Sequence, residues 1–221
     1  MEPTSAHPNL AATSWALLGM LSYGHELSGY DIRKWIDWNM RFYYGSPAQS
    51  QIYSELKKLD RAGLVVSRVE DRGDTRSRRL YKITDAGVEA VTHWANVAPV
   101  DPPTLKHNVL LRVTLGHLSE PGRLKEVLQD HMAWVEKMHR EAAKDARWSR
   151  VEPAWAYARM TLLWAERYLA SERELTLKMI ADLDEAQAVF AETGAAETGI
   201  PWPTPEYWYE IEQRASVEEL D

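Results

Sequence analysis

Hydroxyl and cationic side chains share one face of a helix that the sequence predicts between Ser46 and Gly63. At 100° per residue, Ile52, Leu56 and Leu59 gather within about 60° of one another and form a buried stripe. The polar side chains facing away are those of Ser50, Ser54, Lys57, Lys58 and Arg61, with Tyr53 on the flank. Such groups donate hydrogen bonds to base edges and phosphate oxygens. The chemistry predicted for this face is therefore nucleic-acid binding rather than catalysis.

Capping residues predict where this helix starts. Ser46 has the residue type of an N-cap, Pro47 suits the first helical position, and Gln49 completes a capping box. Two helices are expected before it, one over residues 13–24 and one that starts at a capping box on Ser28. The helix from Ser46 is thus the third of a group of three.

A β-hairpin is predicted directly after the third helix. Residues 64–69 and 80–83 are apolar enough for two antiparallel strands, and Thr84 suits the N-cap of a fourth helix. Cationic side chains crowd the tip and the second strand, at Arg72, Arg76, Arg78 and Arg79. Three helices followed by a two-stranded wing is the order of a winged helix-turn-helix, whose third helix fits the major groove of DNA.

The distribution of charge matters more than its sum. The whole chain has a formal net charge of −7, which by itself argues against a nucleic-acid partner. Residues 46–82, however, hold nine Lys and Arg against five Asp and Glu. Taken alone, the polar helix face or the charged hairpin also suits an ordinary solvated surface. Their combination with a local basic excess favours DNA.

Three sequence segments of the N-terminal part resemble the PadR family of bacterial transcriptional regulators. They are residues 15–32, with Trp-Ala-Leu-Leu-Gly-Met-Leu and Leu-Ser-Gly-Tyr-Asp-Ile, residues 51–64, with Gln-Ile-Tyr-Ser-Glu-Leu, and residues 78–87, with Arg-Arg-Leu-Tyr-Lys-Ile-Thr-Asp-Ala-Gly. The resemblance implies a repressor that binds an inverted-repeat operator as a homodimer. It also implies that Tyr30, Tyr53 and the polar face of the third helix, Gln49 included, contact DNA. Leu80 stands where the family often has an aromatic residue.

The C-terminal half predicts a helical dimerisation domain. Apolar side chains recur at steps of three and four along a long helix expected over residues 119–148, as in coiled coils. In a second long helix, expected over residues 153–190, the apolar residues lie on or near one face. The residues expected to pair with a second chain are Leu124, Leu128, His131, Val135, Met138, Leu162, Leu169, Leu177 and Ile180. The resemblance supports this expectation, because long PadR members dimerise through extended helices.

Tryptophans behind the DNA-binding part allow two interpretations. Core and interface packing is the favoured one, because indoles bury large areas. The alternative is a pocket for a small aromatic effector formed by Trp94, Trp134 and Trp155. No cofactor is expected. No metal site is expected either, because Glu136 and His139 form half of a di-iron motif without a second copy.

Catalysis has no positive feature in the sequence. No cysteine is present, and no phosphate-binding or nucleophile motif occurs, so we expect no enzyme and no catalytic residues. The competing hypothesis is a winged-helix adaptor that binds proteins and no DNA. The chain has neither an apolar stretch long enough to span a membrane nor signal-peptide features, which predicts a cytoplasmic protein without a membrane partner. The resemblance to the PadR family implies that this cytoplasm is bacterial.

The expected fold is mainly α with a small two-stranded β wing: an N-terminal winged helix-turn-helix followed by a long-helix C-terminal dimerisation domain. The division predicted from composition comprises a flexible N-terminus (1–12), the winged helix (13–95), a linker (96–107), the dimerisation domain (108–193) and an aromatic, acidic tail (194–221).

Overall fold

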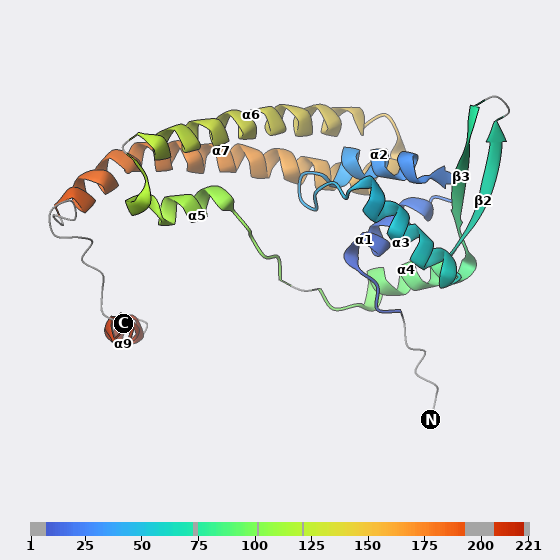
Figure 1. Cartoon of the computed structure of the whole chain (residues 1–221), viewed down its shortest axis with the longest axis horizontal. Coiled ribbons are helices and arrows are strands. Elements are labelled where there is room, and N and C mark those ends of the chain that lie inside the picture. The colour runs from blue at the N-terminus through green and yellow to red at the C-terminus, as the bar shows by residue number, and fades with distance from the viewer. Residues whose placement is uncertain (1–7, 73–74, 101, 121, 193–205, 219–221) are drawn as a thin grey trace. The chain divides into compact units, whose positions relative to one another are not determined.

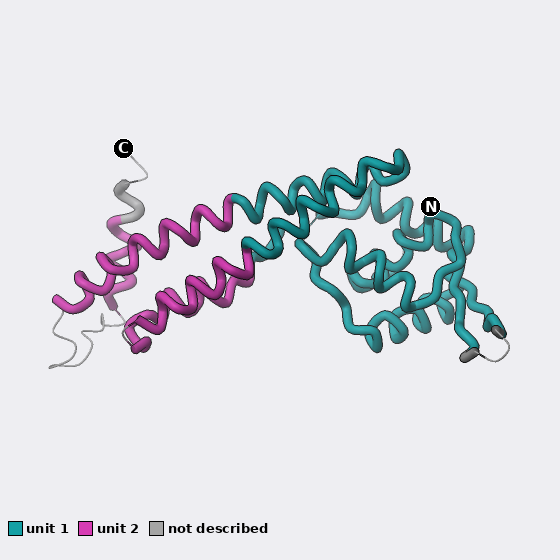
Figure 2. Tube along the Cα trace, turned by 90° about the horizontal axis from the view of Figure 1, so that it is seen from above, with its two compact units in different colours: residues 1–105, 136–170 teal, residues 106–135, 171–221 magenta. Residues whose placement is uncertain are grey.

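The structure is a computed structural model that describes residues 8–72, 75–100, 102–120, 122–192 and 206–218. These residues form helices and one small antiparallel sheet (Figure 1), which confirms the mainly α fold class. The chain forms two compact units, coloured separately in Figure 2: residues 1–105 with 136–170, and residues 106–135 with 171–221. None of the described helices combines the length and the apolarity that crossing a bilayer requires.

The first unit contains the predicted winged helix. Its elements are α1 (Ala12–Leu21), β1 (Leu27–Ser28), α2 (Gly29–Met40), α3 (Gln49–Arg61), β2 (Val65–Arg72), β3 (Thr75–Ile83) and α4 (Asp85–Val97). Strand β3 lies between β1 and β2 and pairs antiparallel with both. The sheet therefore has three strands rather than the two expected. The sequence did not predict β1, because this strand has only two residues, Leu27 and Ser28, and so shows no alternating pattern.

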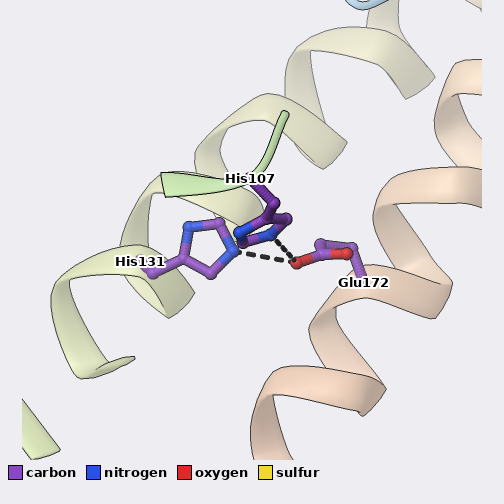
Figure 3. Close-up of side chains that lie close together, drawn as sticks. All are labelled: His107, His131 and Glu172. Atoms are coloured by element: carbon purple, nitrogen blue, oxygen red, sulfur yellow. Dashed lines mark hydrogen bonds and ion pairs between the residues drawn. The ribbon is translucent and has the colours of Figure 1, made fainter. Parts of the chain in front are cut away.

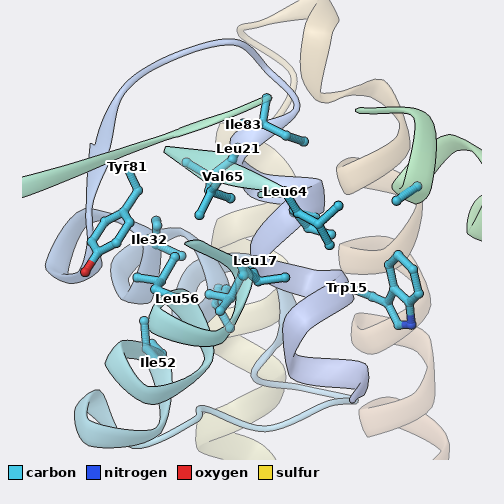
Figure 4. Close-up of a cluster of buried hydrophobic side chains, with 14 residues drawn as sticks. Trp15, Leu17, Leu21, Ile32, Ile52, Leu56, Leu64, Val65, Tyr81 and Ile83 are labelled. Atoms are coloured by element: carbon cyan, nitrogen blue, oxygen red, sulfur yellow. The ribbon is translucent and has the colours of Figure 1, made fainter. Parts of the chain in front are cut away.

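Helices α1, α2 and α3 meet the sheet in one apolar core (Figure 4). The side chains of Leu17, Ile32, Ile52 and Leu56 have no exposed surface. Burial of each such side chain contributes roughly 1.5–3 kcal/mol to stability. This core holds α3 from behind and leaves its other face to the solvent.

Two predicted caps are present. The Ser28 hydroxyl accepts a hydrogen bond from the Asp31 backbone N–H (3.2 Å), and the Asp31 carboxylate accepts one from the Ser28 N–H (3.0 Å). At α4, the Thr84 hydroxyl accepts from the Gly87 N–H (3.1 Å) and donates to the Gly63 carbonyl (2.7 Å). The capping box on Ser28 and the N-cap Thr84 are thus confirmed.

The remaining elements are α5 (Asn108–Thr114), a 3₁₀ turn (Gly116–Leu118), α6 (Arg123–Trp148), a second 3₁₀ turn (Pro153–Trp155), α7 (Ala156–Ala191) and α9 (Tyr207–Glu218). Helices α6 and α7 each contribute residues to both units. The predicted start of α6 at Ser119 is four residues too early, because Ser119 ends the 3₁₀ turn and Gly122 adopts a positive φ of 83°. Within the first unit, Arg41 of α2 pairs with Asp145 (2.8 Å) and Glu141 (3.2 Å) of α6.

Candidate nucleic-acid interface

Helix α3 has the two faces that its sequence predicts. Ile52, Leu56 and Leu59 are fully buried against the core, so the apolar stripe is confirmed. The exposed side chains of the helix include those of Ser50, Tyr53, Ser54, Lys57, Lys58 and Arg61, and Gln49 is half-buried. A row of hydroxyl and cationic groups therefore faces the solvent from a rigid support.

The predicted start of α3 is wrong. The helix begins at Gln49 with Ala48 as its N-cap, and no side chain caps it. The Ser46 hydroxyl instead donates a hydrogen bond to the Asp37 carboxylate of α2. A charged acceptor forms a stronger hydrogen bond than a neutral backbone group does. Ser46 consequently ties the turn before α3 to α2 rather than starting the helix.

The basic residues of α3 differ in whether they form an ion pair within the chain. Lys58 pairs with Glu55 at 2.6 Å. Among the residues that the structure describes, neither Lys57 nor Arg61 has an ion-pair partner. These two side chains are exposed and free to meet a phosphate or a base edge.

Glu55 is a residue that the sequence analysis did not single out. Its side chain lies on the buried side of α3, where the Ser14 hydroxyl of α1 donates to it at 2.7 Å. The hydrogen bond from Lys58 lowers the pKa of Glu55, burial opposes this, and the bond from Ser14 adds to the lowering. Glu55 is therefore a charged link between α1 and α3. At 100° per residue Glu55 lies beside the apolar stripe, but nothing in the spacing indicates a partner on α1.

Acid should weaken this link. The pKa of Glu55 is lower in the folded chain than in the unfolded chain, so its charge stabilises the fold above the unfolded pKa of about 4.3. This contribution disappears as the pH falls through the lowered folded pKa. We expect Glu55→Gln to be less stable than the wild type at neutral pH, and the difference to shrink below about pH 4.3. Urea denaturation followed by circular dichroism across this range measures both effects, and a constant difference would contradict the assignment.

Tyr53 of α3 and Tyr30 of α2 are both exposed. Tyr53 is 44% exposed, and its ring covers Gly29 at the start of α2, where an added Cβ would lie 2.5 Å from the tyrosine Cε1. Tyr30 is 57% exposed, and the Lys34 ammonium lies 5.5 Å from the centre of its ring. Because Gly29 leaves room for the ring, the start of α2 sets the direction of Tyr53.

Cations of the wing are largely paired. Arg78 donates to Glu70 (2.6 Å) and lies 3.8 Å from Asp31, and the exposed Arg79 donates to the Ser67 hydroxyl (3.0 Å). The side chains of Arg72 and Arg76 lie outside the described part of the structure. Leu80, at the position where PadR proteins often have an aromatic residue, is 4% exposed. In the described part of the wing, fewer arginine side chains are available to bind DNA than the sequence suggests.

The three tryptophans of the predicted effector pocket have different ring partners in the structure. Trp94 stacks on Trp15 (ring centroids 5.3 Å apart), and Trp134 stacks on His131 in the second unit. Trp155 lies 5.2 Å from Trp38, in a cavity of about 510 Å³. The residues that line this cavity are Met20, Tyr23, His25, Leu27, Trp35, Trp38, Asn39, Glu152, Ala154, Trp155 and Ala158.

Most of the residues predicted to pair two chains already pack within one. Leu124, Leu128, Val135, Leu162 and Leu169 are buried, and His131, Met138 and Ile180 are half-buried. Leu177 is 44% exposed. The spacing of three and four therefore reports, at least in part, the packing of helices inside a single chain.

Known proteins resemble the chain in sequence and in fold. The "Transcriptional regulator PadR-like family" matches residues 17–93. A curated relative, the "Negative transcriptional regulator PadR" of Bacillus subtilis, is 35% identical over 98 residues, which is 44% of this chain and 53% of the relative. The chain thus spans about half the length of this relative in the alignment.

Solved structures share the fold over most of the chain. Bacillus subtilis PadR in complex with operator DNA superposes with a TM-score of 0.67 at 22% identity, covering 79% of this chain and 99% of that one. The same protein in complex with p-coumaric acid gives 0.61 with the same identity and coverage. The Vibrio cholerae virulence activator AphA gives 0.59 at 19% identity, covering 79% and 99%. The sequence match and these folds agree: residues 17–93 match the PadR-like family of transcriptional regulators, and the solved structures share the fold of the chain.

Proposed function

We propose that the chain is a sequence-specific DNA-binding transcriptional regulator. The observation that carries the proposal is the exposed polar face of α3 above a fully buried apolar stripe. On that face Lys57 and Arg61 have no ion-pair partner among the residues that the structure describes. A major groove about 12 Å wide accepts one α-helix in this presentation. The relative from Bacillus subtilis is a negative regulator, which supports repression as the outcome of binding.

The two parts of the winged helix contribute differently to binding. Helix α3 enters the major groove, where its hydroxyls and cations meet base edges, and the wing follows the phosphate backbone. Two chains related by two-fold symmetry place their α3 helices in successive major grooves about 34 Å apart. This arrangement suits an inverted-repeat operator and a homodimer held together by the long helices.

In this proposal each segment predicted from the sequence has its own role. Residues 13–95 bind DNA, 96–107 link, 108–193 dimerise, and 194–221 form a tail. The chain carries out no catalysis in this scheme, which its regulatory relatives support. Its place of action is the bacterial cytoplasm, where the DNA is.

The proposal includes a small aromatic effector that regulates DNA binding. The cavity beside Trp155 is the site with the right chemistry, because Trp35 and Trp38 add two further indole rings. Offset and edge-on ring contacts favour aromatic ligands. That the PadR of Bacillus subtilis has been solved in complex with p-coumaric acid supports this class of ligand.

The experiment that tests the function is selection of bound duplexes from a random pool, followed by affinity measurements on the selected sequence at several salt concentrations. We expect an inverted repeat to be enriched and the affinity to fall steeply as salt rises, since binding releases counterions. An adaptor without DNA binding would enrich no sequence and show no duplex affinity at any salt. Repeating the selection with small aromatic compounds tests the effector.

Gly29 provides a test of how Tyr53 is held. In Gly29→Ala the new methyl group displaces the tyrosine ring, which is exposed and free to rotate away. We expect thermal stability within about 1 kcal/mol of the wild type and about 10-fold weaker operator binding, the loss of one base or phosphate contact. Gel-shift titration measures the affinity. Full affinity in Gly29→Ala would show that the position of the Tyr53 ring is unimportant.

A further inference from the structure

Three side chains that are distant in the sequence converge in the second unit (Figure 3). His107 is the N-cap of α5, His131 lies on α6, and Glu172 lies on α7. The Nε2 atoms of both imidazoles lie 2.9 Å from the same oxygen, Oε1 of Glu172. One carboxylate oxygen thus lies within hydrogen-bonding distance of the Nε2 atom of both histidines.

The cluster is sheltered but not sealed. The side chains of His107 and His131 are each 12% exposed, and that of Glu172 is 11% exposed. Burial raises the pKa of Glu172, but the hydrogen bonds from His131 and His107 outweigh it and leave a net lowering. A negative carboxylate and two imidazoles therefore share a partly dehydrated space that a small ion can reach.

We propose that His107, His131 and Glu172 bind a divalent transition-metal ion of the zinc type. Two imidazole nitrogens and one carboxylate oxygen are a known zinc ligand set, in which water takes the fourth position. Their ligand atoms all lie within 4.8 Å of one another. Tetrahedral bonds of 2.0–2.2 Å place ligand atoms about 3.3–3.6 Å apart. Each nitrogen, now 2.9 Å from the carboxylate oxygen, therefore moves away from that oxygen by about half an ångström when the ion binds.

The surroundings hold one of the ligands in place. The His131 ring stacks on Trp134, with ring planes inclined by 15°. Orientation by such outer contacts is typical of metal ligands. Imidazole nitrogens favour zinc, copper and nickel over magnesium and calcium.

Ion binding has a structural signature at α5. His107 Nδ1 now accepts a hydrogen bond from the Leu110 backbone N–H (3.2 Å), so the ring proton resides on Nε2. A metal bond to Nε2 moves this proton to Nδ1, because a neutral imidazole carries one N–H. The Leu110 N–H then loses its acceptor. If His107, His131 and Glu172 form hydrogen bonds but bind no metal, an added ion leaves the hydrogen bond of the Leu110 N–H unchanged.

The test is calorimetric titration of ZnCl₂ into the full chain after removal of metals with a chelator. We expect one ion per chain, and at least about 100-fold weaker binding in Glu172→Gln and His131→Gln, which each lack one ligand. His139→Ala is the matched control, since His139 lies on α6 outside the cluster, and it should bind like the wild type. Circular dichroism establishes that each variant is folded.

Hydrogen exchange at the Leu110 amide provides a second measurement that needs no variant. We expect exchange at this amide to accelerate on addition of ZnCl₂. No ion binding by the wild type, or equal affinity in Glu172→Gln and His131→Gln, would overturn the proposal and leave the triad as a hydrogen-bonded link between helices. An unchanged Leu110 amide in the ion-loaded chain would overturn coordination through His107 Nε2.

Discussion

Replacement of Lys57 or Arg61 by alanine is expected to weaken operator binding by about 1–3 kcal/mol each, roughly 5- to 150-fold. Both cations are exposed on α3 without an ion-pair partner among the described residues, so their charge is available to DNA. Their loss leaves the fold intact, because neither side chain contributes to the buried stripe of Ile52, Leu56 and Leu59.

The salt dependence of binding distinguishes two roles for these residues. A side chain that contacts a phosphate lowers the slope of log affinity against log salt by about one when it is removed, and it weakens all duplexes alike. A side chain that contacts a base leaves the slope nearly unchanged and relaxes the preference at one position. Gel-shift titrations on the selected operator and on a scrambled duplex, at three salt concentrations, separate these outcomes.

Lys137→Ala is the matched control, because Lys137 is an exposed cation on α6, outside the winged helix. Its replacement changes the net charge equally and should leave the affinity unchanged. If Lys57→Ala and Arg61→Ala both bind the operator as tightly as Lys137→Ala, then α3 does not enter the groove and the proposed interface is wrong.

Periodicity predicted the parts of the winged helix that depend on burial. Ile52, Leu56 and Leu59 recur at steps of four and three, and this spacing suffices because a helix must bury its apolar side. The cap at Thr84 was also predictable, since its acceptor atom and its partner, the Gly87 N–H, are three residues apart.

Features that depend on partners distant in the sequence escaped prediction. Ser46 has the residue type of a cap, but the carboxylate of Asp37 competes for its hydroxyl in space. The partner of Glu55 is Ser14 of α1, 41 residues earlier in the chain, which no spacing along α3 indicates. The candidate metal ligand Glu172 is 65 residues from His107 and 41 from His131. No local spacing indicates such a cluster.

Gly87→Ala is expected to destabilise the first unit by about 3 kcal/mol, the upper range for overpacking a rigid site. An added Cβ at Gly87 would lie 2.1 Å from the carbonyl oxygen of Leu64 and 2.7 Å from Cγ1 of Ile83. The nearest atom belongs to the backbone, so no change of rotamer relieves the clash. Helix α4 must move away from β2, which also strains the Thr84 cap.

Gly19→Ala is the matched substitution, and it should have the opposite sign. Gly19 lies inside α1, and nothing lies within 4 Å of an added Cβ. Alanine in a helix interior is more stable than glycine by about 0.5–1 kcal/mol, because the unfolded chain has fewer conformations to lose. Urea denaturation followed by circular dichroism gives both free energies of unfolding. Equal stability of the two variants would mean that α4 does not pack on the Leu64 backbone. The expected difference of about 4 kcal/mol, from the same chemical change at two sites, isolates the contact that fixes α4 behind the wing.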